Sequence, residues 1–414
     1  MFAVAEMREV KSAEEVAQME DAFHIGYAMH TTAMRMCRAG VVEREIAGAI
    51  EGVAKSMGLG VSFPSIVSQH GETLHNLNSE GVLADGRLLL VDAGGENLMN
   101  YCSDHTRTYP VSGRFTAQQR EIYDIVLACH DHIARIVRPG MMYMQEVHLE
   151  AYRKLAEGLV GVGLLKGSAD DAVAAGAMYL FMPHGLGHGL GMDVHDCENI
   201  GERSFDYSLV AERAAQSATC LHRATWRLRP GTILSDEPGI YFIPALVDKC
   251  EAEGKFRGIV DYDLLRSRYL DFGGIRIEDD LLVTDTGCRI LGDRTIPVTV
   301  EELEAVVGRS PYAHGRPLPH GGRSRGFPAP LSRRRVPHHG RRPCRCCRRD
   351  GACDRRRTPR SAAAGGHRRR LSRIGGCRRR GRRRRRGARG GIAGTVRRRL
   401  SSDVRCSGAA HGGF

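Results

Sequence analysis

The feature that most constrains this chain is an abrupt change in composition near residue 309. The 106 residues from Arg309 onward contain 33 arginines and three aspartates but no lysine or glutamate, a net charge of +30. Residues 1–308 contain 28 basic and 45 acidic residues, a net charge of −17. The basic segment has too few apolar residues to offset its conformational entropy by burial. We therefore expect one folded acidic domain at 1–308 and a disordered Arg-rich tail at 309–414.

Two interpretations of this tail remain open. Its Arg, Gly, Pro, Ala and Cys are typical of a GC-rich reading frame translated out of register, so we favour a frameshift artefact. If the tail is a genuine product, its arginine runs predict non-specific nucleic-acid binding through phosphate contacts. The cysteines at 344–347 and Cys353 fit no common zinc-site spacing, so we expect no zinc knuckle.

The acidic part of the chain has the patterning of a soluble globular protein. None of its apolar runs approaches the roughly 20 residues that a membrane helix needs. The N-terminus lacks the basic and apolar regions of a secretory signal. Seven cysteines are scattered through residues 1–308 without framework spacing, which is typical of free thiols in a reducing compartment. We expect a cytoplasmic protein that does not associate with membranes.

Helices and short strands alternate along this domain, which favours an α+β fold. Capping-box patterns at Ser12–Glu15 and Thr116–Gln119 predict the starts of helices that end near Gly40 and Gly140. Further helices are expected at 43–57, about 144–159 and 298–307, and strands at 88–91, 103–111, 231–235 and 274–284. A Gly/Ala-rich connection leads to Phe181, and residues 197–228 are expected to form a loop insertion.

Four carboxylates stand at the ends or in the interior of the expected strands: Asp92, Asp104, Glu237 and Glu278. A charge at the end of a buried strand is costly unless it is paired or metal-bound. Asp104 follows Asp92 by 12 residues, a distance that lets a hairpin bring the two together. Four converging carboxylates would repel one another and partly hold protons. Two divalent cations would match their charge.

The Gly-rich segment 183–196 adds three histidines: His184, His188 and His195. One imidazole with four carboxylates forms a hard, oxygen-rich ligand set, which favours Mn²⁺, Co²⁺, Fe²⁺ or Zn²⁺ over metals that prefer thiolates. A water molecule shared by two such ions becomes hydroxide near neutral pH and can attack a peptide carbonyl. This donor set therefore predicts a metal-dependent hydrolase.

Five segments, in order, resemble the pita-bread metallopeptidases: VDAGG (91–95), SDHTRT (103–108), PHGLGHGLGMDVHD (183–196), DEPGIYF (236–242) and IRIEDDLLVT (275–284). Within this fold the match is to Xaa-Pro aminopeptidases and Xaa-Pro dipeptidases, over about residues 8–305. The resemblance implies an α+β pita-bread domain, with two pseudo-related halves around a curved, mostly antiparallel sheet. It also implies two metal ions inside the concavity, with Mn²⁺ the expected metal.

The resemblance assigns a role to each matching position. The implied metal ligands are Asp92, Asp104, His188, Glu237 and Glu278. Glu237 would also move a proton from the shared water to the leaving nitrogen. The implied residues outside the ligand set are His75, His184, His195 and Arg276. His75 would line the substrate site and shuttle protons, the other two histidines would contact the substrate, and the arginine would orient a ligand carboxylate.

The resemblance implies hydrolysis of the N-terminal residue from a peptide substrate that has proline in the second position. An Xaa-Pro dipeptidase and a non-catalytic or damaged member of the fold are the alternatives. The Asp92–Asp104 spacing is one residue longer than the commonest spacing in the family. The family's peptidases usually carry a preceding N-terminal domain, whereas this sequence starts close to the linker helix. We expect a homo-oligomer if that domain is not required.

Overall fold

The computed structural model describes residues 2–197 and 227–309. These belong to the first of two units of the chain, Met1–Arg325 and Gly326–Phe414. The expected tail from residue 310 onward and nearly all of the expected insertion at 197–228 lie outside the described residues. Among the helices that are described, none combines the length and apolarity needed to cross a bilayer.

Helices and strands alternate as expected for an α+β fold. The helices of the described residues are α1 (Phe2–Glu9), α2 (Ala13–Met36), α3 (Glu43–Met57), α4 (Ala117–Ile136), α5 (His148–Gly161), α6 (Ala169–Ala174), α7 (Pro244–Ala252), α8 (Tyr262–Arg268) and α9 (Val300–Val306). The strands are β1 (Gly60–Val61), β2 (Ile66–Ser68), β3 (Leu88–Ala93), β4 (Gly95–Glu96), β5 (His105–Pro110), β6 (Ile233–Asp236), β7 (Gly239–Tyr241), β8 (Gly274–Arg276), β9 (Asp279–Val283) and β10 (Cys288–Ile290).

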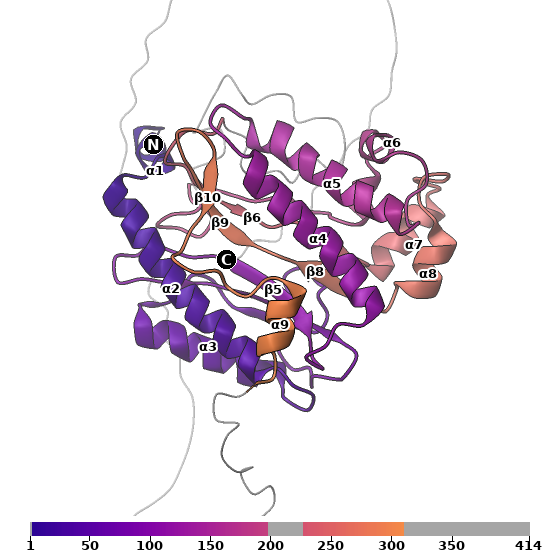
Figure 1. Ribbon diagram of the computed structural model, residues 1–414, viewed down its shortest axis with the longest axis horizontal. Helices are drawn as coiled ribbons and strands as arrows, with labels where there is room; N and C mark the ends of the chain where they lie inside the picture. Colours follow the sequence, from indigo (N-terminus) through magenta and orange to yellow (C-terminus); the bar gives the residue numbers. More distant parts are fainter. Residues whose placement is uncertain (1, 198–226, 310–414) are drawn as a thin grey trace, which may run out of the picture. The chain divides into compact units, whose positions relative to one another are not determined.

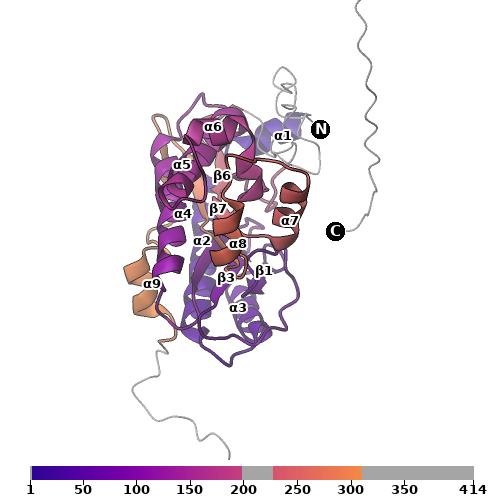
Figure 2. The same cartoon turned by 90° about the vertical axis from the view of Figure 1, so that its right-hand side faces the viewer.

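The strands form short sheets in which every described pairing is antiparallel. The sheet orders are β2-β3-β5, β10-β9-β6, β7-β8 and β1-β4. Helices α2 and α3 pack against the first of these sheets, while α4 packs against β6, β7 and β8. In Figure 1, α4 and α5 run side by side, and Figure 2 shows them on one side of β3, β6 and β7.

Local sequence signals explain the two longest helices. The capping boxes predicted before α2 and α4 are both confirmed, with Ser12 and Thr116 accepting hydrogen bonds from the backbone of the third helical residue. Helix α2 approaches β5 so closely that a Cβ at Gly26 would lie 2.7 Å from His105 Nδ1. Glycine is therefore required at position 26. Helix α2 ends at Met36, rather than near Gly40 as expected, because Cys37 adopts extended backbone.

The β3–β5 hairpin carries the first two carboxylates. Every residue of both strands is buried, although β3 is mostly apolar and β5 is mostly polar. Asp92 pairs with Thr106 across the hairpin, and Asp104 stands immediately before β5. The hairpin therefore brings the two aspartates to the same end of the sheet, as the spacing predicted.

The single strand expected at 274–284 is wrong, because the chain forms β8 and β9 with a break at Ile277–Glu278. Strand β8 pairs with β7, whereas β9 pairs with β6. At the break, the Ile277 amide donates to Pro238 O and the Glu278 amide donates to Thr106 O at 3.0 Å. The change of partner explains the break and places Glu278 beside β5.

Three further expectations need correction. The connection to Phe181 contains α6 and a 3-10 turn at Ala177–Leu180, because Ser168 caps a short helix that composition alone did not reveal. The helix expected at 144–159 starts with a π-helical turn at Tyr143–Val147. Helices α1, α7 and α8 were not predicted.

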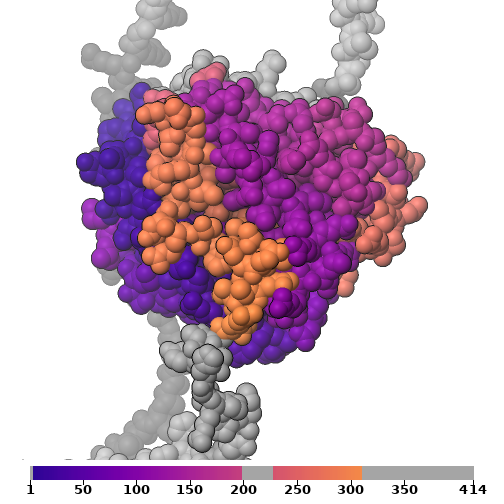
Figure 3. Space-filling model, viewed as in Figure 1, coloured from indigo at the N-terminus to yellow at the C-terminus, as the bar shows by residue number. Residues whose placement is uncertain are grey.

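The last described segment closes the domain. Figure 3 shows residues of β10 and α9, in orange, running between α2 and the region of α4 on one face. Tyr123 on α4 donates to Val298 O at 2.6 Å, and the Gly308 amide donates to Met34 O on α2 at 2.9 Å. The segment therefore bonds both to α4 and to α2.

Arg107 on β5 is fully buried and joins the same parts from inside. Its guanidinium donates to both oxygens of Asp279 at 2.8 and 3.0 Å, and to the carbonyl of Glu278 at 2.7 Å. It also reaches the carbonyls of Ile296 and Pro297. Burial alone would raise the pKa of Asp279, but Arg107 and His130 hold that pKa well below its ordinary value.

Replacing Arg107 with methionine should therefore destabilise the metal-free domain by about 3 kcal/mol, because the buried Asp279 would keep only one of its two cationic partners, His130. Urea denaturation followed by circular dichroism measures this free energy of unfolding. The control is Arg114→Met, which removes an ion pair to Glu304 from a side chain that is 71% exposed and should change little. Equal effects of the two substitutions would contradict the role given to Arg107.

Candidate metal centre

Five side chains of metal-ligand type converge from five separate segments. Asp92 lies in β3, Asp104 precedes β5, His188 lies on the Gly-rich loop after α6, Glu237 follows β6, and Glu278 fills the break between β8 and β9. All are buried except Glu237, whose side chain is 19% exposed. The residues that the sequence singled out as ligands therefore lie in one region of the described structure.

The tightest part of this region contains three of the five. One ligand atom each from Asp104, His188 and Glu278 lies within 4.8 Å of the others, an arrangement that could hold a metal ion. His188 Nε2 is 3.3 Å from Asp104 Oδ2 and 3.7 Å from Glu237 Oε1. One imidazole nitrogen thus faces two carboxylates.

The orientation of His188 suits a metal ligand. Its Nδ1 lies 3.0 Å from the carbonyl oxygen of Gly189, which can only accept, so Nδ1 carries the hydrogen. Nε2 faces the carboxylates and is therefore the nitrogen that a metal ion could bind once the proton of Nε2 is displaced. The backbone is fixed as well, because the His188 amide donates to Ser235 Oγ at 3.0 Å.

Two buried carboxylate oxygens also point to a missing cation. Asp92 Oδ1 and Asp104 Oδ1 have no hydrogen-bond partner among the described residues. A buried polar atom without a partner is costly, so such atoms call for an explanation. A bound cation would satisfy both, and the oxygen-rich set with one imidazole matches the preferences of Mn²⁺, Fe²⁺, Co²⁺ and Zn²⁺. The residues present therefore fit the metal that the sequence predicted.

Without a metal, protons take the place of the cation. Burial raises the pKa of Asp104 to about 6 and that of Glu237 to about 7. Burial, reinforced by the neighbouring carboxylates, also raises the pKa of Glu278. Burial lowers the pKa of His188, but Asp104 and Glu237 outweigh it and raise that pKa to about 9. The cluster therefore attracts positive charge, whether protons or metal ions.

Arg276 on β8 is the cation that the protein itself supplies. Its Nη2 donates to Asp92 Oδ2 in a buried ion pair, and its Nη1 donates to the Tyr241 hydroxyl at 3.0 Å. Arg276 is therefore buried beside a carboxylate of the cluster.

Tyr241 was not singled out from the sequence. Because its oxygen accepts from Arg276, its hydrogen points to His184 Nε2, 2.9 Å away. His184 Nδ1 then donates to Gly185 O at 2.7 Å. Its position in β7, two residues after Gly239 and four after Glu237, was the available signal, because alternate residues of a strand share a face.

The remaining predicted residues are three histidines, of which two lie at the edge of the cluster. The His195 ring packs at right angles to the His188 ring, with 4.3 Å between centroids. His75 lies on the loop after β2 with an exposed side chain. His184 and His195 are half-buried. The structure thus brings two of the three histidines against the buried carboxylates and their partners, and leaves His75 on the surface.

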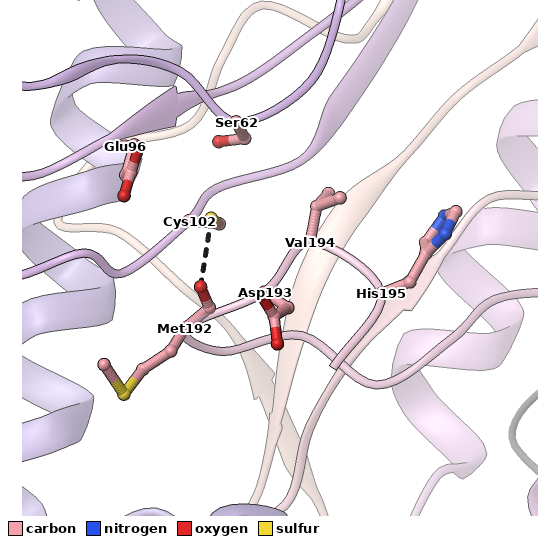
Figure 4. Close-up of a pocket in the computed structure, with 7 residues that line it drawn as sticks. All are labelled: Ser62, Glu96, Cys102, Met192, Asp193, Val194 and His195. Atoms are coloured by element: carbon pink, nitrogen blue, oxygen red, sulfur yellow. Dashed lines mark hydrogen bonds between the residues drawn. The ribbon is translucent and has the colours of Figure 1, made fainter. Parts of the chain in front are cut away.

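A cavity of about 450 Å³ has His195, whose ring packs against that of His188, in its lining (Figure 4). The lining residues come from the segment after β1, from the β3–β5 hairpin and from the Gly-rich loop: Ser62, Glu96, Cys102, Met192, Asp193, Val194 and His195. Within this lining, Cys102 donates to Met192 O at 3.8 Å. The cavity has the size of a small-ligand pocket and reaches the same hairpin that carries Asp92 and Asp104.

Comparison with known proteins identifies the family. Residues 17–285 match the model of metallopeptidase family M24. The Xaa-Pro aminopeptidase of Escherichia coli K12 is 38% identical over 307 residues, which cover 73% of this chain and 60% of that protein. A probable Xaa-Pro aminopeptidase of Aspergillus fumigatus is 34% identical and covers 73% and 63%. The chain therefore spans less than two thirds of the length of these relatives.

Solved structures give the same answer. Zinc-substituted E. coli aminopeptidase P in complex with product has a TM-score of 0.59 and 36% identity, over 73% of this chain and 60% of that one. Proline aminopeptidase P II from Yersinia pestis has a TM-score of 0.59 and 35% identity, over 73% and 61%. The predicted pita-bread fold is thereby confirmed. Since the family model covers well over half of its length, the chain belongs to metallopeptidase family M24.

Proposed function

We propose that this protein is a dinuclear metal-dependent aminopeptidase that releases the N-terminal residue from peptides with proline in the second position. The observation that carries the proposal is the convergence of Asp104, His188 and Glu278 within 4.8 Å, next to buried carboxylate oxygens without partners. The preference for proline is supported by the names of the relatives alone. It remains a proposal because the chain covers only 60% of the E. coli enzyme.

The proposed ligands are Asp92, Asp104, His188, Glu237 and Glu278. Mn²⁺ is our first choice of metal, with Co²⁺, Zn²⁺ and Fe²⁺ as alternatives, since all suit a set of four carboxylates and one imidazole. Zinc is present in one solved relative, E. coli aminopeptidase P. When bound, two such ions polarise a peptide carbonyl and activate a water molecule for attack on it.

We assign proton transfer to Glu237. Its side chain is the most accessible of the five proposed ligands, and the family resemblance gives the same task to this position. Ser235 Oγ donates to Oε1 at 3.3 Å, which leaves Oε2 facing His184 Nδ1 at 4.0 Å. The proton taken from the attacking water would pass from Glu237 to the leaving nitrogen of the proline.

Substrate binding is proposed for the histidines, and Arg276, which orients Asp92, supports one of them through Tyr241. His184 is held by Tyr241, which Arg276 holds in turn, so the three form a fixed wall beside Glu237. His195 stands between His188 and the 450 Å³ cavity, where it could contact the peptide and stabilise the tetrahedral intermediate. We retain His75 as a residue that meets the substrate from the exposed loop, because its role rests on the family resemblance.

The first test is the metal content. Purified Asp104→Ala should bind fewer than the two Mn²⁺ ions per chain expected of the wild type, and its activity should fall by about 100-fold or more. Atomic emission spectroscopy measures the stoichiometry. Asp248→Ala removes an exposed carboxylate from α7 and should bind as wild type does. Two ions retained by Asp104→Ala would count against the assignment.

The second test is the choice of peptide. The wild-type protein loaded with Mn²⁺ should cleave Ala-Pro-Ala faster than Ala-Pro, and Ala-Ala-Ala should be the poorest of the three. Mass spectrometry of the released alanine measures each rate. Cleavage of Ala-Pro alone would favour an Xaa-Pro dipeptidase instead.

The third test is the pH dependence of metal binding. The pKa values of Asp104, Glu237 and His188, about 6, 7 and 9, are all raised, so each group holds more protons at neutral pH than an unperturbed one. Metal must displace these protons, so the affinity for Mn²⁺ should fall as the pH is lowered from 9 to 6, by about tenfold per unit for each proton displaced. Calorimetric titrations at several pH values would detect this. An affinity that stays constant over that range would show that these groups do not bind the metal.

A further inference from the structure

Thr106 lies fully buried between Arg276 and Glu278, at the position where β5 meets the break between β8 and β9. Arg276 Nε lies 3.0 Å from Thr106 Oγ1, and Thr106 Oγ1 lies 2.6 Å from Glu278 Oε2. The proposed ligand and the arginine are therefore connected through a single hydroxyl group.

The direction of these two hydrogen bonds follows from their chemistry. A guanidinium nitrogen can only donate, so Thr106 Oγ1 must accept from Arg276. The single hydrogen of the hydroxyl is then free to point at Glu278 Oε2, which accepts it. The distance of 2.6 Å between the two oxygens is that of a direct hydrogen bond. The polarity runs from Arg276 through Thr106 to Glu278.

This arrangement lets one arginine orient two carboxylates. Arg276 Nη2 holds Asp92 directly, and its Nε holds Glu278 through Thr106. The Glu278 backbone is fixed independently, since its amide donates to Thr106 O at 3.0 Å and its carbonyl accepts from Arg107 at 2.7 Å. With the backbone fixed, the hydrogen bond from Thr106 restrains the side-chain torsions that place and orient the Glu278 carboxylate.

The neighbouring threonine of β5 provides a contrast. Thr108 is equally buried, but its hydroxyl donates to the carbonyl of Arg276 at 3.0 Å and so links the backbones of two strands. The hydroxyl of Thr106 instead bonds to two side chains, the guanidinium of Arg276 and the carboxylate of Glu278. Thr106 and Thr108 are both buried in β5, so burial and strand position do not explain why their hydroxyls bond to different kinds of group.

We propose that Thr106 is a positioning residue, which presents the carboxylate of Glu278 to a bound cation. This inference rests on the proposed metal centre, and it adds a residue outside the ligand set whose hydroxyl determines how well that centre forms. Partners of this kind commonly change metal affinity by about 10- to 100-fold when they are removed.

The test compares three variants by calorimetric titration of the metal-free full-length protein with Mn²⁺. Thr106→Val keeps the shape of the side chain but removes the donor, and should weaken Mn²⁺ binding by about 10- to 100-fold. Thr106→Ser keeps the hydroxyl and should bind within about threefold of wild type. Thr31→Val is the matched control, because it removes a buried hydroxyl that bonds only to the backbone of α2. It should leave Mn²⁺ affinity unchanged.

The melting temperature of each metal-free variant separates folding from metal binding. Wild-type Mn²⁺ affinity in Thr106→Val would overturn the proposal. A Thr106→Ser variant that binds Mn²⁺ as weakly as Thr106→Val, or tenfold more weakly than the wild type, would also overturn it. The serine variant keeps the test decisive even if the valine variant does not fold. A wild-type protein that binds Mn²⁺ tightly but cleaves no peptide would contradict the proposed function alone. A wild-type protein that binds no Mn²⁺ would overturn both.

Discussion

The rest of the structure depends on how buried negative charge is compensated. Asp92, Asp104 and Glu278 are almost completely removed from solvent, and Glu237 is only partly exposed. Carboxylates so placed repel one another and lose hydration, which is why the pKa values of Asp104, Glu237 and Glu278 are raised. Arg276 and His188 supply positive charge, but they leave carboxylate oxygens of two aspartates without partners among the described residues. Divalent cations complete this balance.

The fold brings the charged side chains of distant segments to one place. The β3–β5 hairpin supplies two aspartates, and the break between β8 and β9 supplies Glu278 at the point where the chain changes its strand partner. Arg107 binds the carbonyl of Glu278 at that break and the carboxylate of Asp279 just after it, so the position of Glu278 depends on a buried ion pair with Asp279. The ion pair of Arg107 and Asp279, which stabilises the fold, is thus next to the proposed ligand Glu278.

Sequence reasoning was most successful where the signal is local. The helix expected at 43–57 has those bounds, and both predicted capping boxes are present. It failed at 274–284, because a run of alternating residues does not reveal that the chain exchanges one partner strand for another. It also missed Tyr241 and Thr106. Both lie within recognised motifs, but their importance depends on hydrogen bonds to Arg276 across strands, which no spacing along the chain encodes.

The most direct test of this account is a crystal structure of the protein soaked with Mn²⁺, with anomalous difference maps recorded at the manganese edge. The account predicts two peaks, each about 2.0–2.2 Å from oxygen or nitrogen atoms of the five proposed ligands. It also predicts that Thr106 still donates to Glu278 in that structure. Peaks held by other residues, or an empty cluster in crystals that bind Mn²⁺ elsewhere, would contradict the dinuclear centre from which the proposed activity follows.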